Sequence, residues 1–379
     1  METLLAFAAM RGMHVTVLTS YTGTHMSAWE ISRAVVRVTV GLVVLAQTWS
    51  VQGKVAQKTS PPPVIATNSP QVGKSPVKVF ILAGQSNMEG HGTIKGTQKG
   101  TLETLLKDPA SADRYTHLVG KDGRWIVRND VWSVYWDDRG SLTPGRFAGS
   151  NNEIGPELGI GLNLGDYLDN QVLLIKVAVG GTSLAQNWRP PSSGGATGGW
   201  YVEMIKVVKE QLKDLKKGFP AYDGKGYEIA GFCWHQGWQD GCSAGMANEY
   251  ETNMVNFIKD VRKDFGVPKM PFVIGGSGFG GWGQTVDRRL KIMAAQKAAA
   301  ERPEFKGNVL YVETRDFFRD GDVSPRPIRY HWCCNFESYY LIGDGMGKAM
   351  VELLGGPKAP PNPTGPSLRR AHQVAGVKL

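Results

Sequence analysis

Two residues far apart in the sequence, Ser86 and His331, have the types and settings that acyl transfer requires. Ser86 ends the run VFILAGQS, in which an apolar stretch stops abruptly at a glycine. A serine hydroxyl attacks a carbonyl only when a base takes its proton, and His331 in the run RYHWCC is the candidate base. The simpler interpretation of Ser86 is a turn residue after a strand, but the flanking amides at Gln85 and Asn87 favour a nucleophile.

Acyl transfer also needs hydrogen-bond donors that are already in place for the oxyanion of the tetrahedral intermediate. The backbone N–H groups of Ser86 and Gly181 and the side-chain amide of Gln236 are the candidates. Gly181 lies in the run GGTSL, where the missing Cβ lets the backbone approach a substrate closely. Asp240, four residues after Gln236, is a candidate third member of a catalytic triad, a charge at a helix N-terminus or a contact to substrate hydroxyls.

The elements that position these residues are predicted from apolar patterns. Five short runs are rich in Val, Ile and Phe and almost continuously apolar, which suits strands buried on both faces of a parallel sheet. They are residues 77–83, 171–179, 228–234, 271–275 and 308–313. Apolar residues at helical spacing predict helices within 153–168, 204–215, 250–265, 287–302 and 336–354. This alternation predicts a three-layer α/β fold around a central five-stranded parallel sheet.

The carboxyl ends of parallel strands are where such folds bind ligands. The first three strands end in GQSNM, GGTSL and WHQG, and His331 follows the fifth strand. We therefore expect these four segments to meet at one edge of the sheet. Residues 91–150 form a long insertion after the first strand, and its aromatic side chains predict either a sugar-stacking wall or a small core of its own: Trp125, Trp132, Tyr135 and Trp136.

These segments resemble those of the SGNH hydrolases, and most closely the sialate O-acetylesterase-like and acetylxylan-esterase-like carbohydrate esterases. The resemblance covers roughly residues 77–354, and GQSNM is its most specific block. It implies a flavodoxin-like fold, no metal or other cofactor, Ser86 as nucleophile and His331 as base, with Gly181 and Gln236 as oxyanion partners. It also suggests four candidate substrate-binding residues: Gln85, Asn87, Glu157 and His235.

Two positions depart from the family pattern. Trp238 stands where the family often has a glutamate after WxQG, and Ile328 stands where an aspartate usually precedes the base by three residues. The group that orients His331 is therefore either Asp240 or a backbone carbonyl in the loop before His331. Two other histidines have simple interpretations, His235 as a partner of neighbouring backbone and His91 as an ordinary loop residue.

The net charge of +9 is not gathered into a dense basic block, and no zinc-finger or helix-turn-helix signature is present, which argues against nucleic acid as a partner. An apolar run at 38–46 follows an Arg-containing segment that begins at Met26. The run is too short to span a bilayer and fits a secretion signal. We expect a signal and Pro/Ser-rich linker at 1–76, an esterase domain at 77–356, a tail at 357–379, and a secreted or periplasmic protein without stable membrane insertion.

Export would expose the four cysteines to an oxidising compartment. Because Cys242 follows the Gln236 loop and Cys333 and Cys334 follow His331, we expect Cys242 to pair with one of the latter two. Cys233, inside a strand, is expected to stay reduced. The alternative is that all four are reduced packing residues. No Cys-x-x-Cys pair is present, so a structural zinc is not expected.

These patterns together predict a serine carboxylester hydrolase. Its expected substrate is an acetylated glycan or oligosaccharide, from which it would remove O-acetyl groups through an acyl-enzyme intermediate. A catalytically inactive carbohydrate-binding protein on the same fold and an esterase acting on a non-sugar ester remain as alternatives.

Overall fold

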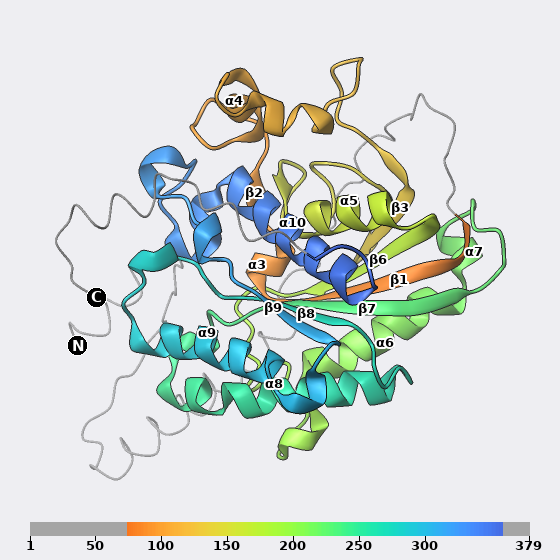
Figure 1. Cartoon of the computed structure of the whole chain (residues 1–379), viewed down its shortest axis with the longest axis vertical. Helices are drawn as coiled ribbons and strands as arrows, with labels where there is room; N and C mark the ends of the chain where they lie inside the picture. The colour runs from red at the N-terminus through yellow and green to blue at the C-terminus, as the bar shows by residue number, and fades with distance from the viewer. Residues whose placement is uncertain (1–73, 359–379) are drawn as a thin grey trace, which may run out of the picture. The chain divides into compact units, whose positions relative to one another are not determined.

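A seven-stranded sheet forms the centre of residues 74–358, the part of the chain that the computed structural model describes (Figure 1). Five of its strands are those predicted from the sequence: β1 (Lys74–Gly84), β6 (Asn170–Ala178), β7 (Tyr227–His235), β8 (Phe272–Gly275) and β9 (Val309–Val312). The predicted α/β class is therefore confirmed. The predicted secretion signal, and the predicted tail from residue 359 onward, lie outside the described residues.

The five predicted strands run parallel in the spatial order β6-β1-β7-β8-β9. Counted along the chain this is the second, first, third, fourth and fifth strand, which is the flavodoxin-like order. The sheet is wider than predicted because the insertion adds β3 (Arg128–Tyr135), parallel to β6, and β4 (Asp138–Leu142), an antiparallel edge strand.

The register of the central strands brings three loops together. Gly84, the last residue of β1, pairs with Ala178 of β6 on one side and with His235 of β7 on the other. The three strands therefore end level with one another, and the segments that follow them emerge at the same edge of the sheet.

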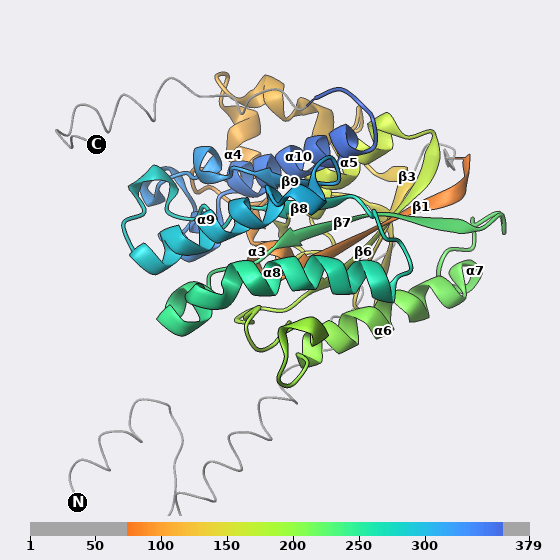
Figure 2. The ribbon, with the colours of Figure 1, turned by 60° about the horizontal axis from the view of Figure 1, so that its bottom comes forward.

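Helices cover both faces of the sheet and complete three layers (Figure 2). Helices α5 (Glu157–Tyr167) and α10 (Phe336–Leu353) pack against each other on one face. The other face carries α6 (Gly199–Lys213), α8 (Ala244–Asp264) and α9 (Asp287–Ala300). All five predicted helices are present. Within residues 74–358, none of the helices is both long enough and apolar enough to cross a membrane.

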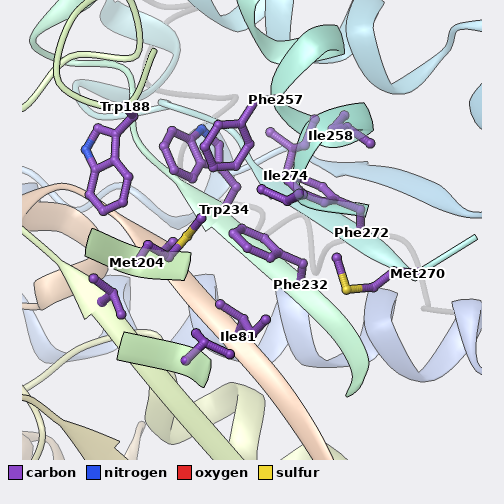
Figure 3. Close-up of a cluster of buried hydrophobic side chains, with 14 of the residues drawn as sticks. Ile81, Trp188, Met204, Phe232, Trp234, Phe257, Ile258, Met270, Phe272 and Ile274 are labelled. Atoms are coloured by element: carbon purple, nitrogen blue, oxygen red, sulfur yellow. The ribbon is translucent and has the colours of Figure 1, made fainter. Parts of the chain in front are cut away.

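The core between the sheet and α8 is rich in aromatic side chains (Figure 3). Phe232 of β7 stacks on Phe272 of β8 with ring centroids 4.8 Å apart, and Trp234 packs on Phe257 of α8 at 4.6 Å. Full burial of one such side chain contributes about 1.5–3 kcal/mol. This packing fixes β7, whose last two residues, Trp234 and His235, are the first two of the WHQG segment.

The insertion packs as part of the domain, so most of its aromatic residues do not form a sugar-stacking wall. Trp132 and Tyr135 are buried in β3, and Trp125 is half-buried against the part of the core that contains Tyr135. Trp136 is the exception, with 38% of its surface exposed. A second, two-stranded ladder pairs β2 (Gly92–Thr93) with β5 (Glu153–Ile154).

Candidate active site

Ser86 stands at the carboxyl end of the central strand. It is the first residue of the short helix α3 (Ser86–Glu89), which begins two residues after β1 ends. The turn depends on Gly84, because a Cβ there would lie 2.2 Å from the carbonyl oxygen of His235. Helix N-termini leave their first backbone N–H groups without helical partners. Among the described residues, none accepts a hydrogen bond from the N–H of Ser86.

The amides that flank Ser86 hold the surrounding loops. Gln85 Oε1 accepts hydrogen bonds from the backbone N–H groups of Gly237 (3.1 Å) and Gln239 (3.3 Å), which ties α3 to the loop after β7. Asn87 donates from Nδ2 to the carbonyl of Tyr330 (3.1 Å) and accepts from the Tyr339 hydroxyl (3.0 Å). Both amides are buried, and these bonds position the loops around Ser86.

The candidate base and the candidate nucleophile meet directly. His331 Nε2 lies 3.0 Å from Ser86 Oγ, although the residues are 245 positions apart. Ile328, at the position of the usual aspartate, contributes only its carbonyl, which accepts from the backbone N–H groups of His331 (2.9 Å) and Cys333 (3.0 Å). Trp332, Cys333 and Cys334 all have φ between 52° and 55°, a costly conformation for residues with side chains.

The electrostatics of His331 favour its neutral form. Burial, reinforced by the neighbouring His91, lowers the pKa of His331 to about 4, and Glu153 opposes the shift. A neutral imidazole accepts a proton, so His331 is in the form that a general base needs at neutral pH. Within residues 74–358, its ring makes one hydrogen bond, the one to Ser86.

The loop after β6 lies against the nucleophile. A Cβ on Gly180 would sit 3.6 Å from Ser86 Cβ, while Gly181 has open space around it and a φ of 71°. Gly181 is therefore required by its backbone conformation and not by crowding. No acceptor in the described part of the chain takes the N–H of Gly181.

Gln236 and Asp240 brace this loop. Gln236 Nε2 donates to the carbonyl of Thr182 (2.9 Å) and to Asp240 Oδ2 (2.6 Å). Asp240 also accepts the backbone N–H groups of Leu184 and Ala185, each at 2.9 Å. Both Gln236 amide hydrogens are thus used within the protein, and among the described residues no hydrogen bond joins Asp240 to His331.

The comparisons with known proteins identify the family of this chain. The family model for carbohydrate esterases of the sialic acid-specific acetylesterase type matches residues 76–335. The chain belongs to this carbohydrate esterase family.

Individual relatives are distant. A protein named as a probable carbohydrate esterase from Arabidopsis thaliana is 26% identical over 204 residues, which are 52% of this chain and 68% of that protein. A solved Arabidopsis thaliana structure covers 73% of this chain and 99% of its own at 20% identity, with a TM-score of 0.48. A carbohydrate acetylesterase from Xanthomonas citri covers 73% and 56% at 12% identity, with a TM-score of 0.47.

Glu157, a candidate substrate contact, is buried inside this carbohydrate esterase. Its Oε2 lies 2.6 Å from Lys176 Nζ, and the two side chains are 1% and 0% exposed. The backbone N–H of Gly155 donates to the other carboxylate oxygen at 2.7 Å. Glu157 is therefore half of a buried ion pair that a substrate does not reach in this structure.

The two remaining histidines of the site differ. His235 is buried, its Nδ1 donates to the carbonyl of Gly275 at 3.0 Å, and burial lowers its pKa to about 4. This is the backbone partnership anticipated for it. His91 is not an ordinary loop residue, because its ring lies against that of His331 with centroids 4.3 Å apart. No sequence pattern singled out His91 or its neighbour Glu153.

The predicted disulfide is wrong, because all four cysteines of the esterase are free. Cys242 is exposed and its thiol donates to the carbonyl of Trp238, while Cys233, Cys333 and Cys334 are buried. Packing and the tight turn after His331 hold the base loop without a covalent bridge.

A hollow adjoins the base. It has a volume of about 340 Å³ and is lined by Phe279, Gly283, Gln284, Thr285, Arg289, Arg329 and Tyr330. Tyr330 directly precedes His331, is 43% exposed and packs against Trp238 with ring centroids 5.1 Å apart. Trp238, which replaces the family's glutamate, thus supports an aromatic wall beside the base.

Proposed function

We propose that this carbohydrate esterase is a serine hydrolase that removes O-acetyl groups from a glycan through an acyl-enzyme intermediate. The observation that carries the proposal is the 3.0 Å contact between His331 Nε2 and Ser86 Oγ at the carboxyl end of the sheet. A nucleophile within hydrogen-bond reach of a neutral base is the arrangement that activates serine.

In the proposed reaction, Ser86 Oγ attacks the acetyl carbonyl while its proton moves to His331 Nε2. The N–H groups of Ser86 and Gly181 donate to the oxyanion. The sugar hydroxyl then leaves with the proton from His331, and Ser86 keeps the acetyl group. Water gives a proton to His331 and attacks the carbonyl of the acyl-enzyme. The bond between Ser86 Oγ and the acetyl carbon then breaks, His331 returns the proton to Ser86 Oγ, and acetate leaves. Gln236 and Asp240 act in this scheme by holding the Gly181 loop, because their bonds to Thr182, Leu184 and Ala185 fix its path.

The sugar substrate is supported by the hollow beside His331. Aromatic faces such as Tyr330 stack on the apolar faces of sugar rings, and the guanidinium groups of Arg289 and Arg329 can donate to hydroxyl or acidic substituents. An exported location is part of the proposal and rests on the signal-like segment that begins at Met26.

Acetate release from O-acetylated glycans and from a small activated acetate ester tests the proposal. We expect Ser86→Ala to lower kcat about ten-thousand-fold or more, because nucleophile and base act as a unit, and to leave the Tm unchanged. Ser133→Ala is the matched control, since the Ser133 hydroxyl is buried in β3 and has no hydrogen-bond partner within residues 74–358. A Ser86→Ala enzyme with near-parental turnover would end the serine mechanism.

A further inference from the structure

Among residues 74–358, no carboxylate contacts His331 directly to balance the charge that would develop on its ring during the reaction. Asp240 is engaged with the loop after β6, and Ile328 replaces the usual aspartate. The ring of His331 instead stacks on His91 at 4.3 Å between centroids, with the ring planes 33° apart. His91 Nδ1 lies in turn 3.6 Å from Glu153 Oε2, so a carboxylate sits one ring away from the base.

The backbone builds this juxtaposition. His91 directly precedes β2, Glu153 begins β5, and the antiparallel ladder pairs Thr93 with Glu153. The close approach also needs Gly149, because a Cβ there would lie 2.8 Å from Glu153 Oε2 and 3.0 Å from His91 Nδ1. The short ladder between β2 and β5 thus places the His91 ring and the Glu153 carboxylate beside His331.

The pair is largely enclosed, which strengthens its electrostatic effect. The side chains of His91 and Glu153 are 20% and 15% exposed, and His91 Nε2 is buried with no partner among the described residues. Tyr339 of α10 meets the His91 ring edge-on, with centroids 6.3 Å apart. Although burial acts to raise the pKa of Glu153, the nearby His91, Ser150 and the Arg326 guanidinium outweigh it and lower that pKa, so Glu153 is anionic.

The charged and titratable groups that act on His331 are few. Burial and His91 lower its pKa, and Glu153 raises it. Around the pair, the charge of Arg326 favours a lower pKa of Glu153. Burial and the Glu153 charge both raise the pKa values of Cys334 and Tyr339. Glu153 is the carboxylate that favours the protonated form of the base.

We propose that Glu153 and His91 form the positioning pair for His331 and take the place of the triad aspartate. This inference rests on the proposed serine mechanism. The stacked His91 ring fixes the plane of the His331 imidazole, so that Nε2 faces Ser86. As Ser86 transfers its proton, the Glu153 carboxylate stabilises the His331 imidazolium through the intervening ring.

Glu153→Gln keeps the shape of the side chain and removes its charge. We expect kcat on a small activated acetate ester to fall about ten- to a hundredfold with little change in KM, less than the roughly ten-thousand-fold loss when a directly bonded triad aspartate is neutralised. Glu153→Asp, which keeps the charge, should recover part of kcat. Equal losses in the Gln and Asp variants would assign the effect to packing and overturn the proposal.

His91→Phe keeps a stacked ring and removes the link to Glu153. We expect a similar fall in kcat and a shift of the acid limb of the kcat/KM profile to higher pH, since His91 no longer lowers the pKa of His331. Because Glu153 acts on His331 through His91, adding Glu153→Gln to the His91→Phe variant should lower kcat by less than about a further threefold. Fully multiplicative losses would show that the residues act independently and would refute the pair.

The control variant and the parallel measurements separate this inference from the proposed function. Glu304→Gln also neutralises a carboxylate with a cationic partner, Lys259 at 3.1 Å, on the exposed surface, and should leave kcat unchanged. If Ser86→Ala abolishes turnover while Glu153→Gln and His91→Phe keep parental kcat, the pair has no catalytic role and the serine mechanism stands. If Ser86→Ala retains turnover, the serine mechanism itself fails.

Discussion

Replacing Lys176 with methionine should destabilise the domain strongly, because Lys176 neutralises a carboxylate that is buried beneath the active site. Its ammonium group lies 2.6 Å from Glu157 Oε2 and donates to the carbonyls of Glu89 (2.7 Å) and Phe147 (2.6 Å). Glu89 ends α3, so the same ammonium group anchors the helix that carries Ser86. Methionine has a similar length and apolar volume but cannot replace these bonds.

The size of the expected loss of stability follows from the Glu157 carboxylate, which Lys176→Met leaves buried without its partner. Removing one partner of a buried ion pair costs about 3–5 kcal/mol, since the remaining charge stays out of water. Burial already raises the pKa of Glu157 even though Lys176 opposes it, and without Lys176 that pKa rises further. A carboxyl group such as Glu157, whose pKa is higher in the folded than in the unfolded state, destabilises the fold increasingly as the pH rises above the unfolded-state pKa. The cost of Lys176→Met should therefore be largest at pH 8 and shrink as the pH falls toward 5.

Urea unfolding followed by tryptophan fluorescence at pH 5 and pH 8 measures this effect. Lys206→Met is the control, because Lys206 is 57% exposed and its pair with Glu203 at 3.3 Å is a surface contact that contributes less than about 0.5 kcal/mol. A Lys176→Met domain as stable as the parent at pH 8, or a loss that does not depend on pH, would refute this account of the buried pair.

Three further outcomes are expected. The kcat/KM for a small acetate ester should stay level from neutral pH down to about pH 5 and fall through an inflection near pH 4, since burial and then His91 lower the pKa of His331 to about 4; an inflection near 6.5 would show an unperturbed base. Asp240→Asn should lower the Tm by roughly 4 °C and turnover of both ester and glycan about tenfold, because its new NH₂ opposes the N–H of Leu184 or Ala185; an unchanged Tm would contradict the bracing role. In the native protein a maleimide should label Cys242 and leave Cys233, Cys333 and Cys334 unmodified, as peptide mass spectrometry would detect.

The strand pattern carried most of the information about the fold. Strands buried on both faces of a parallel sheet are continuously apolar, so β1, β6 and β7 were visible in the sequence. Strand β4 (Asp138–Leu142) was missed because it contains charged residues and lies at the sheet edge, where a strand needs no apolar run. For the aromatic residues of the insertion, a sugar-stacking wall and a small core were both considered, and the structure places Trp132 and Tyr135 in the core.

The site was predictable where strand ends determine it and not elsewhere. Ser86 and His331 were singled out because a polar residue type follows an apolar strand or precedes the last helix. The four-residue spacing of Gln236 and Asp240 does not reveal that both side chains turn toward the Thr182–Ala185 backbone. The meeting of His91 with Glu153 depends on a ladder of two residues per strand, too short to leave a periodic pattern.

The separation of Ser86 from His331 also affects how the protein becomes active during folding. Ser86 follows β1, the first strand of the sheet, and His331 lies 245 residues later, in the loop just before α10. Contacts this distant in sequence form late, because closing the chain between them costs entropy before any bond is gained. If Ser86 and His331 act as proposed, a nascent chain contains Ser86 long before it contains His331, and Asn87 beside Ser86 gains its partners Tyr330 and Tyr339 equally late. The appearance of activity would then report that the two distant ends of the domain have met.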